Sequence, residues 1–289
     1  MPHRCPQSAV EVSSPLTDAV AGCAPGGSRI GPTSTSGGAP TRCAEPTGNI
    51  LLDGLPWSSL QALRPLLDEV ALPVGRVVAR PDEPVGLAWF PVSGVFAEVV
   101  HLSNGATVEV NLIGREGMAG LPPLLGTDRV PTAITTLVGG SFLCAPARAL
   151  VGRSAVDCAL ATRLLRYAQA VLSVRAYSIV CDRLHTVQAR LARWLLKTGD
   201  RLATDELTLT QDDLALMLGV SRPSITVNAL AFQEAGLIRY HRGRIRIVDR
   251  AGLEAAACEC YGAIREEFER LLGWRVGQEP VRDQDAARG

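Results

Sequence analysis

The period of the apolar positions changes along the chain. Short runs rich in Val, Ile and Thr recur between turn residues, and they predict strands at 74–79, 87–90, 95–102, 107–113 and 133–138. Asn104-Gly105 separates two alternating runs and predicts a hairpin, because both central residues of a type I′ turn need positive φ. From Ser154 onward the spacing becomes helical. We therefore expect an α+β fold, with an N-terminal antiparallel β-roll followed by helices.

The N-terminal segment differs in composition from the rest. Residues 1–45 contain 22 Pro, Gly, Ser or Thr and no aromatic residue. Such a segment cannot bury enough apolar surface to offset the entropy of ordering, so residues 1–46 are expected to form a disordered tail. Structure should begin near Asn49, and leucines at helical spacing predict a helix over 58–70.

A long helix is expected over residues 154–182. Apolar side chains there follow alternating steps of four and three, which is the spacing of a heptad seam. We predict that two copies of the chain join along this seam; the alternative is a helix that packs only on its own domain. The seam residues are Leu160, Leu164, Tyr167, Val171 and Val174.

Two short helices are predicted between Leu209 and Ala235. Thr210 can cap the first with Asp213 three positions later, and Gly219 ends it. Ser221 can then cap the second helix. Two short helices joined by a tight glycine turn form a helix-turn-helix. The residues that follow, 239–249, predict a two-stranded wing with Arg-Gly-Arg at its tip.

Local charge points to nucleic acid. Basic and acidic residues are equal over the whole chain, at 29 each, but residues 183–250 carry eleven Arg or Lys against seven Asp or Glu. Arginines at a wing tip suit phosphate oxygens, while the second helix would contact base edges. The expected DNA contacts are Thr210, Gln211, Ser221, Arg222, Pro223, Ser224, Thr226, Val227, Asn228, Arg242 and Arg244.

The order of roll, long helix, helix-turn-helix and basic wing resembles the Crp/Fnr family of bacterial transcription regulators. The resemblance is most specific at residues 210–238. It implies a homodimer, a cyclic-nucleotide-binding-like roll at 47–153, a dimerisation helix at 154–182, and a winged helix-turn-helix at 183–250 that enters the DNA major groove. Residues 251–289 would form a helical extension and tail. RNA polymerase is expected as a further partner.

The sequence departs from the family pattern where other members bind cyclic nucleotides. Leu121 stands where a glutamate would bond the ribose, and Pro131 where an arginine would pair with the phosphate. A buried phosphate without its cation is costly, so we expect no cAMP binding. Arg129 is the nearest possible substitute for the missing cation. The corresponding effector pocket would comprise Gly117, Gly120, Leu121, Arg129, Thr132 and Ala133.

The cysteines predict no cofactor. Cys5, Cys23 and Cys43 are too widely spaced for an iron–sulfur cluster. Cys258 and Cys260 lack a second pair at zinc-site spacing, so no metal is assigned. Scattered cysteines fit a reducing compartment, and we expect a cytoplasmic protein.

No catalytic site is predicted, because the sequence contains no nucleophile elbow, no phosphate-binding loop and no His-Glu-x-x-His motif. No membrane helix is expected either. The sequence thus predicts a homodimeric regulator that binds double-stranded DNA at an inverted repeat. The alternative is a cyclic-nucleotide- or redox-responsive signalling module.

Overall fold

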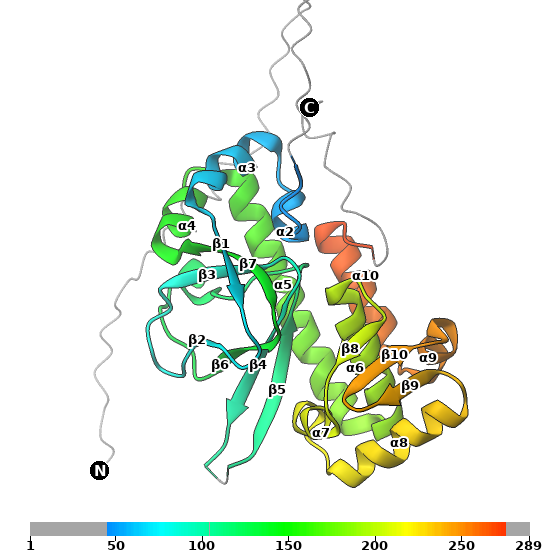
Figure 1. Ribbon diagram of the computed structural model, residues 1–289. Helices are drawn as coiled ribbons and strands as arrows, with labels where there is room; N and C mark the ends of the chain where they lie inside the picture. Colours follow the sequence, from blue (N-terminus) through cyan, green and yellow to red (C-terminus); the bar gives the residue numbers. More distant parts are fainter. Residues whose placement is uncertain (1–44, 104, 276–289) are drawn as a thin grey trace, which may run out of the picture.

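We describe residues 45–103 and 105–275 from a computed structural model of the chain (Figure 1). The predicted tail at 1–46 falls almost entirely outside the described residues, as do Asn104 and residues 276–289. Asn49 caps the first described helix, α2 (Ile50–Asp53), by accepting a hydrogen bond from Leu52 N. The predicted start of structure near Asn49 agrees with this cap.

The strands of the roll form two antiparallel sheets, with orders β1-β7-β3 and β2-β6-β4-β5. Phe96 and Phe142, one from each sheet, lie with ring centroids 4.4 Å apart in a shared apolar cluster. The predicted α+β class is confirmed. The strands are β1 (Asp68–Leu72), β2 (Val77–Ala79), β3 (Leu87–Pro91), β4 (Val95–His101), β5 (Thr107–Ile113), β6 (Ala133–Val138) and β7 (Gly140–Pro146).

The helix predicted over 58–70 is too long. α3 (Trp57–Leu63) ends before Pro65, and a 3-10 turn, η1 (Arg64–Leu66), follows. Proline has no N–H to continue the helical ladder. The next residues form β1, which pairs with β7 at the edge of its sheet. Most of β1 is exposed, so it lacks the alternation that would have predicted a strand.

A long helix that follows the roll and a shorter helix near the end of the described residues lie side by side (Figure 1). α5 (Cys158–Leu184) follows α4 (Ala147–Ser154) and extends from the roll to the C-terminal domain. Asp157 begins it by accepting a hydrogen bond from Leu160 N. α10 (Cys260–Leu272), which comes after the C-terminal domain in sequence, packs along α5.

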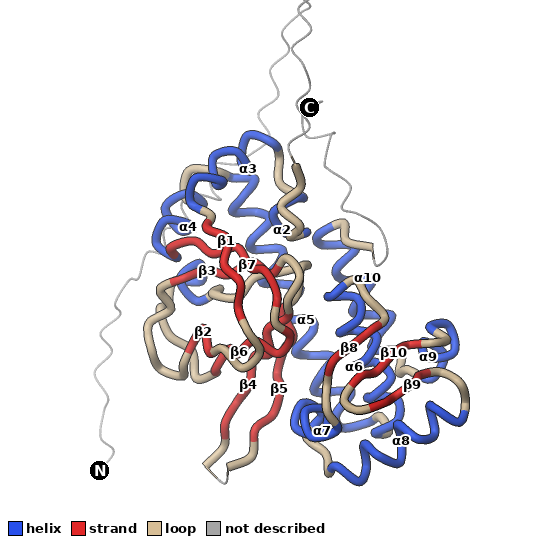
Figure 2. Tube along the Cα trace, in the orientation of Figure 1, coloured by secondary structure: helices blue, strands red, loops and turns tan. Residues whose placement is uncertain are grey.

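The C-terminal domain combines four helices with a small antiparallel sheet of order β8-β10-β9 (Figure 2). Ser221 and Gly219 separate the two helices predicted for the helix-turn-helix. The elements are α6 (Val187–Leu202), β8 (Glu206–Thr208), α7 (Gln211–Leu218), α8 (Arg222–Glu234), β9 (Ile238–His241), β10 (Arg244–Ile247) and α9 (Arg250–Ala256).

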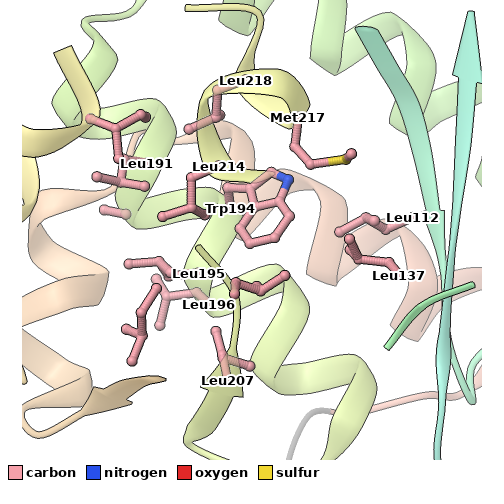
Figure 3. Close-up of a cluster of buried hydrophobic side chains, with 14 of the residues drawn as sticks. Leu112, Leu137, Leu191, Trp194, Leu195, Leu196, Leu207, Leu214, Met217 and Leu218 are labelled. Atoms are coloured by element: carbon pink, nitrogen blue, oxygen red, sulfur yellow. The ribbon is translucent and has the colours of Figure 1, made fainter. Parts of the chain in front are cut away.

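One apolar core joins the roll to the C-terminal domain (Figure 3). Leu112 and Leu137 come from strands of the roll, and Trp194 comes from α6. Leu214 and Met217 of α7 complete the junction. The first helix of the helix-turn-helix is thus packed between its own domain and the roll.

Candidate nucleic-acid interface

Both helices of the helix-turn-helix are capped by side chains from their own sequence. Asp213 N donates to Thr210 Oγ1 at 3.1 Å, and Thr210 N donates to Asp213 Oδ2 at 2.8 Å. This is the predicted capping box. Gly219 ends α7 with φ of +63°, and Ser221 caps α8. The two helices meet at 111°, within the range of about 90–120° that is usual for a DNA-binding helix-turn-helix.

The outward face of α8 combines a charged and an apolar side chain. Ile225, Ala229 and Phe232 turn inward into the core and fix which face is free. Arg222 lies at the free edge, and its Nε is 3.5 Å from Asp212 Oδ1. Val227 is 66% exposed in the middle of the helix. This face therefore offers a guanidinium for guanine or phosphate and a methyl surface for thymine.

The other polar residues predicted on α8 are engaged within the protein. Thr226 Oγ1 donates to Gln211 Oε1 at 2.7 Å, and Asn228 Nδ2 donates to Ser224 O at 2.7 Å. Ser221 and Ser224 share a hydrogen bond at the start of the helix. Only the bond from Thr226 joins α8 to α7, because those of Asn228, Ser221 and Ser224 lie within α8 and its cap. Sequence reasoning did not separate these internal roles from base reading.

The wing is a tight hairpin of β9 and β10. Arg242 and Gly243 have φ of +47° and +78°, the combination required by a type I′ turn. Arg242 and Arg244 are exposed, as are Arg239 and Arg246. The wing therefore presents four guanidinium groups to solvent, as the sequence predicted.

The N-terminus of α7 lies between the wing and α8. Leu209 N donates to Gly243 O at 2.8 Å, and the Gln211 side chain accepts the hydrogen bond from α8. Tyr240 of β9 donates from its hydroxyl to Leu209 O at 3.3 Å. Burial and the nearby Asp213 carboxylate raise the pKa of the Tyr240 hydroxyl, and the positive charge of Arg222 opposes that rise. The wing and the free edge of α8 are therefore parts of one surface.

A cavity of about 180 Å³ lies between the roll and α5. Gly120 and Leu121 line it, but the other predicted pocket residues do not. Arg129 is exposed and donates to Asp82 O at 2.9 Å, so it is not available to replace the missing phosphate-binding arginine. Gly117 instead permits close packing of Tyr167, whose hydroxyl donates to Met118 O at 3.0 Å.

The charged groups of this cavity are Glu98 and Arg175. Arg175 donates to both carboxylate oxygens of Glu98 at 2.7 Å, and Thr132 Oγ1 donates to one of them at 2.9 Å. Thr132 does not line the cavity but hydrogen-bonds Glu98, which does. Ala133 is buried in β6. Sequence reasoning missed this ion pair, because Arg175 lies on the helix 77 residues away from Glu98.

The predicted seam of α5 faces inward. Leu160, Leu164, Tyr167, Val171 and Val174 are each at most 5% exposed, and they pack in one cluster with residues of α2, the roll and α10. Side chains covered by their own chain cannot contact a second copy. The alternative, a stripe that packs on its own domain, is therefore the correct interpretation for these five residues.

Comparison with known proteins agrees with this geometry. A model of the Crp-like helix-turn-helix domain matches residues 189–256. FixK2 from Bradyrhizobium japonicum superposes with a TM-score of 0.59 at 17% identity, over 66% of this chain and 98% of that one. Residues 189–256 thus match a Crp-like helix-turn-helix domain, and the chain shares its fold with the compared regulator. The predicted Crp-like helix-turn-helix and the predicted fold are confirmed.

Two regulators from Thermus thermophilus extend the comparison of the Crp/Fnr fold. One, of the CRP family, has a TM-score of 0.54 at 18% identity and covers 65% of this chain and 96% of its own. The other, of the CRP/FNR family, has a TM-score of 0.53 at 21% identity and covers 66% and 98%. No curated protein matches by sequence.

No single helix in the described part of this chain is long and apolar enough to cross a membrane. α7 and α8 pass a test of length and composition only when taken together, as a pair bent by 111°. That pair is the helix-turn-helix itself.

Proposed function

We propose that this chain regulates transcription as a homodimer that binds an inverted-repeat operator. The observation that supports this most is the single surface formed by Arg222 and Val227 of α8 and by Arg242 and Arg244 of the wing. The two half-sites would lie about one helical turn apart, roughly 10–10.5 base pairs. Contact with RNA polymerase follows from this role, and transcription in vitro from the bound operator would test it.

The two parts of the surface take different roles in this proposal. Arg222 and Val227 project from a helix narrow enough to enter the major groove, where base edges are read. Arg242 and Arg244 flank a turn at the edge of the domain, where they would meet phosphates and carry no sequence information. Thr226 would position the reading helix through its hydrogen bond to Gln211 of α7, while the hydrogen bond of Asn228 stays within α8.

Binding of variants to operator and to scrambled DNA across a salt series separates these roles. Arg242→Ala and Arg244→Ala should weaken binding to both DNAs alike. The slope of log affinity against log salt concentration should become shallower by about one unit for each phosphate interaction removed in each half-site. Arg222→Ala and Val227→Ala should instead reduce the preference for operator, by about 1–3 kcal/mol for each base that is no longer read. Arg80→Ala, an exposed roll arginine, is the control. Equal weakening on both DNAs for the α8 variants would exclude this helix as the reader.

We infer that the homodimer forms along a second stripe of α5. Leu165, Gln169, Leu172, Ala176 and Ile179 follow steps of four and three on the face opposite the buried stripe. Leu172 is 59% and Ile179 64% exposed in the single chain. Large apolar side chains at heptad spacing on an exposed helix are the usual seat of a partner helix.

We also propose that the cavity beside α5 accepts a small, largely apolar molecule rather than a cyclic nucleotide. Its walls include Ile113, Met118 and Val171, and its one arginine, Arg175, is already paired with both oxygens of Glu98, so no free cation is left for a phosphate. Calorimetry with cAMP and cGMP is the test. A dissociation constant below about 10 μM, roughly −7 kcal/mol, would contradict the proposal.

A further inference from the structure

Four side chains with metal-binding atoms meet where α5 ends. Cys181 lies in the last turn of α5, and His185 caps that helix. Cys258 and Cys260 lie in the link between α9 and α10 and at the start of α10. All three cysteines are buried, and their sulfurs and one histidine nitrogen lie within 4.8 Å of one another.

The distances suit four ligands around a single ion. Tetrahedral bonds of about 2.3 Å from zinc to sulfur place two sulfurs about 3.8 Å apart. The sulfurs of Cys181 and Cys258 are separated by 3.5 Å, and Cys260 Sγ lies 3.7 Å from His185 Nδ1. An iron–sulfur cluster would need a wider ligand set, because its ligands are bonded to different irons.

A carboxylate orients the histidine ring. His185 Nε2 lies 3.2 Å from Glu259 Oε2, so the proton placed on Nε2 leaves the lone pair of Nδ1 directed at the sulfurs. Metal-binding histidines in proteins commonly donate their other nitrogen to a carboxylate in this way. Glu259 lies between Cys258 and Cys260 in sequence and is 81% exposed.

A buried arginine faces the same group. Arg193 is 7% exposed, and its Nε has no hydrogen-bond partner among the residues that the structure describes. Its charge lies within electrostatic reach of all three sulfurs. Three thiolates, a neutral imidazole and a divalent ion have a net charge of −1, which a single guanidinium balances. Without such an anion, this buried cation would lack a countercharge in the cluster.

We propose that Cys181, His185, Cys258 and Cys260 bind one Zn²⁺ ion in a closed structural site. The four protein ligands complete a tetrahedron and leave no position for substrate, which is typical of structural zinc. Binding would displace the thiol protons. The sequence predicted no metal because Cys258 and Cys260 lacked a second pair of ligands. In the structure, Cys181 and His185 supply that second pair. The ion would fasten α10 to the junction between α5 and α6.

Metal analysis of protein purified under reducing conditions tests this site independently of DNA binding. We expect one zinc per chain, and Co²⁺ in its place should give the visible bands of tetrahedral cobalt with a thiolate charge-transfer band. Cys181→Ser and Cys258→Ser should lose the metal. Cys144→Ser, which changes a buried free cysteine of the roll, should retain it.

Glu259→Gln covers the case in which a ligand variant fails to fold. This exposed change keeps all four ligands and should weaken zinc affinity by about 10- to 100-fold in a chelator competition. Folded wild-type protein that neither contains nor binds zinc or cobalt would overturn the proposal. A disulfide between Cys181 and Cys258 in protein kept without oxygen would overturn it as well.

Discussion

Glu109 Oε1 lies 2.8 Å from Lys197 Nζ across the boundary between the roll and the DNA-binding domain. The two side chains are only 5% and 8% exposed. Trp194 Nε1 donates to the second oxygen of the same carboxylate at 2.6 Å. Lys197 is the sole lysine of the chain, so one ammonium group and one indole balance the buried carboxylate. Breaking such a pair from one side leaves a buried charge uncompensated.

Lys197→Met should lower the free energy of unfolding by about 3–5 kcal/mol, because Glu109 would stay buried with the indole as its remaining partner. Chemical denaturation at neutral pH measures this loss. Arg246→Met is the matched control, since Arg246 lies 3.8 Å from Glu206 and both are more than 60% exposed. The control should change stability by about 0–1 kcal/mol. Similar losses in the two variants would contradict the role given to burial.

The same lysine predicts a pH dependence. Burial lowers the pKa of Lys197 from 10.5 to about 8, and Glu109 opposes that shift only in part. Between these values the unfolded chain binds more protons at this residue than the folded chain, so its contribution to stability rises with pH. Relative to Lys197→Met, wild type should gain about 1–3 kcal/mol from pH 8 to about pH 10. A flat or falling difference in unfolding free energy would argue against the lowered pKa.

The two stripes of α5 should respond differently to charge. Leu172→Glu combined with Ile179→Glu should give a folded monomer on light scattering, because both changes lie on the exposed stripe. Leu164→Glu should unfold the chain instead, since Leu164 is 4% exposed. Arg166→Glu, on the surface beside the stripe, should leave the dimer intact. Wild-type protein that is monomeric at micromolar concentration would refute the dimer.

Stability and DNA affinity should separate at the wing tip. Arg242 holds φ of +47°, a conformation that asparagine tolerates better than arginine. Arg242→Asn should therefore raise the free energy of unfolding by about 0.5–1 kcal/mol while weakening binding to any DNA. Arg244→Asn lies in β10, where the backbone is extended, and should weaken DNA binding without the gain in stability. Thermal unfolding measures the change in stability, and binding to scrambled DNA measures the change in affinity.

Features encoded within a few consecutive residues could be predicted. Thr210 and Asp213 form a capping box over three positions, and Gly219 and Ser221 mark the turn between the helices. Arg242-Gly243 fixes the wing hairpin in the same local way. Backbone geometry and short-range hydrogen bonds determine these features, so they do not depend on the rest of the fold.

Features that depend on distant partners could not be predicted. α5 carries two stripes at heptad spacing, one through Leu164 and one through Leu172, and periodicity alone cannot tell which of them the roll covers. Cys181 and Cys258 are separated by 77 residues, so their meeting follows from the packing of α10 on α5. The ion pair of Glu98 and Arg175 has the same origin.

α10 packs against α5, the helix that directly precedes α6 in the chain. The DNA-binding domain is connected to α5 through α6 at one end and through α10 at the other, where Phe268 and Leu272 share a core with Leu51 of the N-terminal domain. A rigid body held at one point can turn about any axis through it, but a body held at two can turn only about the line that joins them. Any reorientation of α8 that leaves both attachments intact is thus restricted to a single degree of freedom.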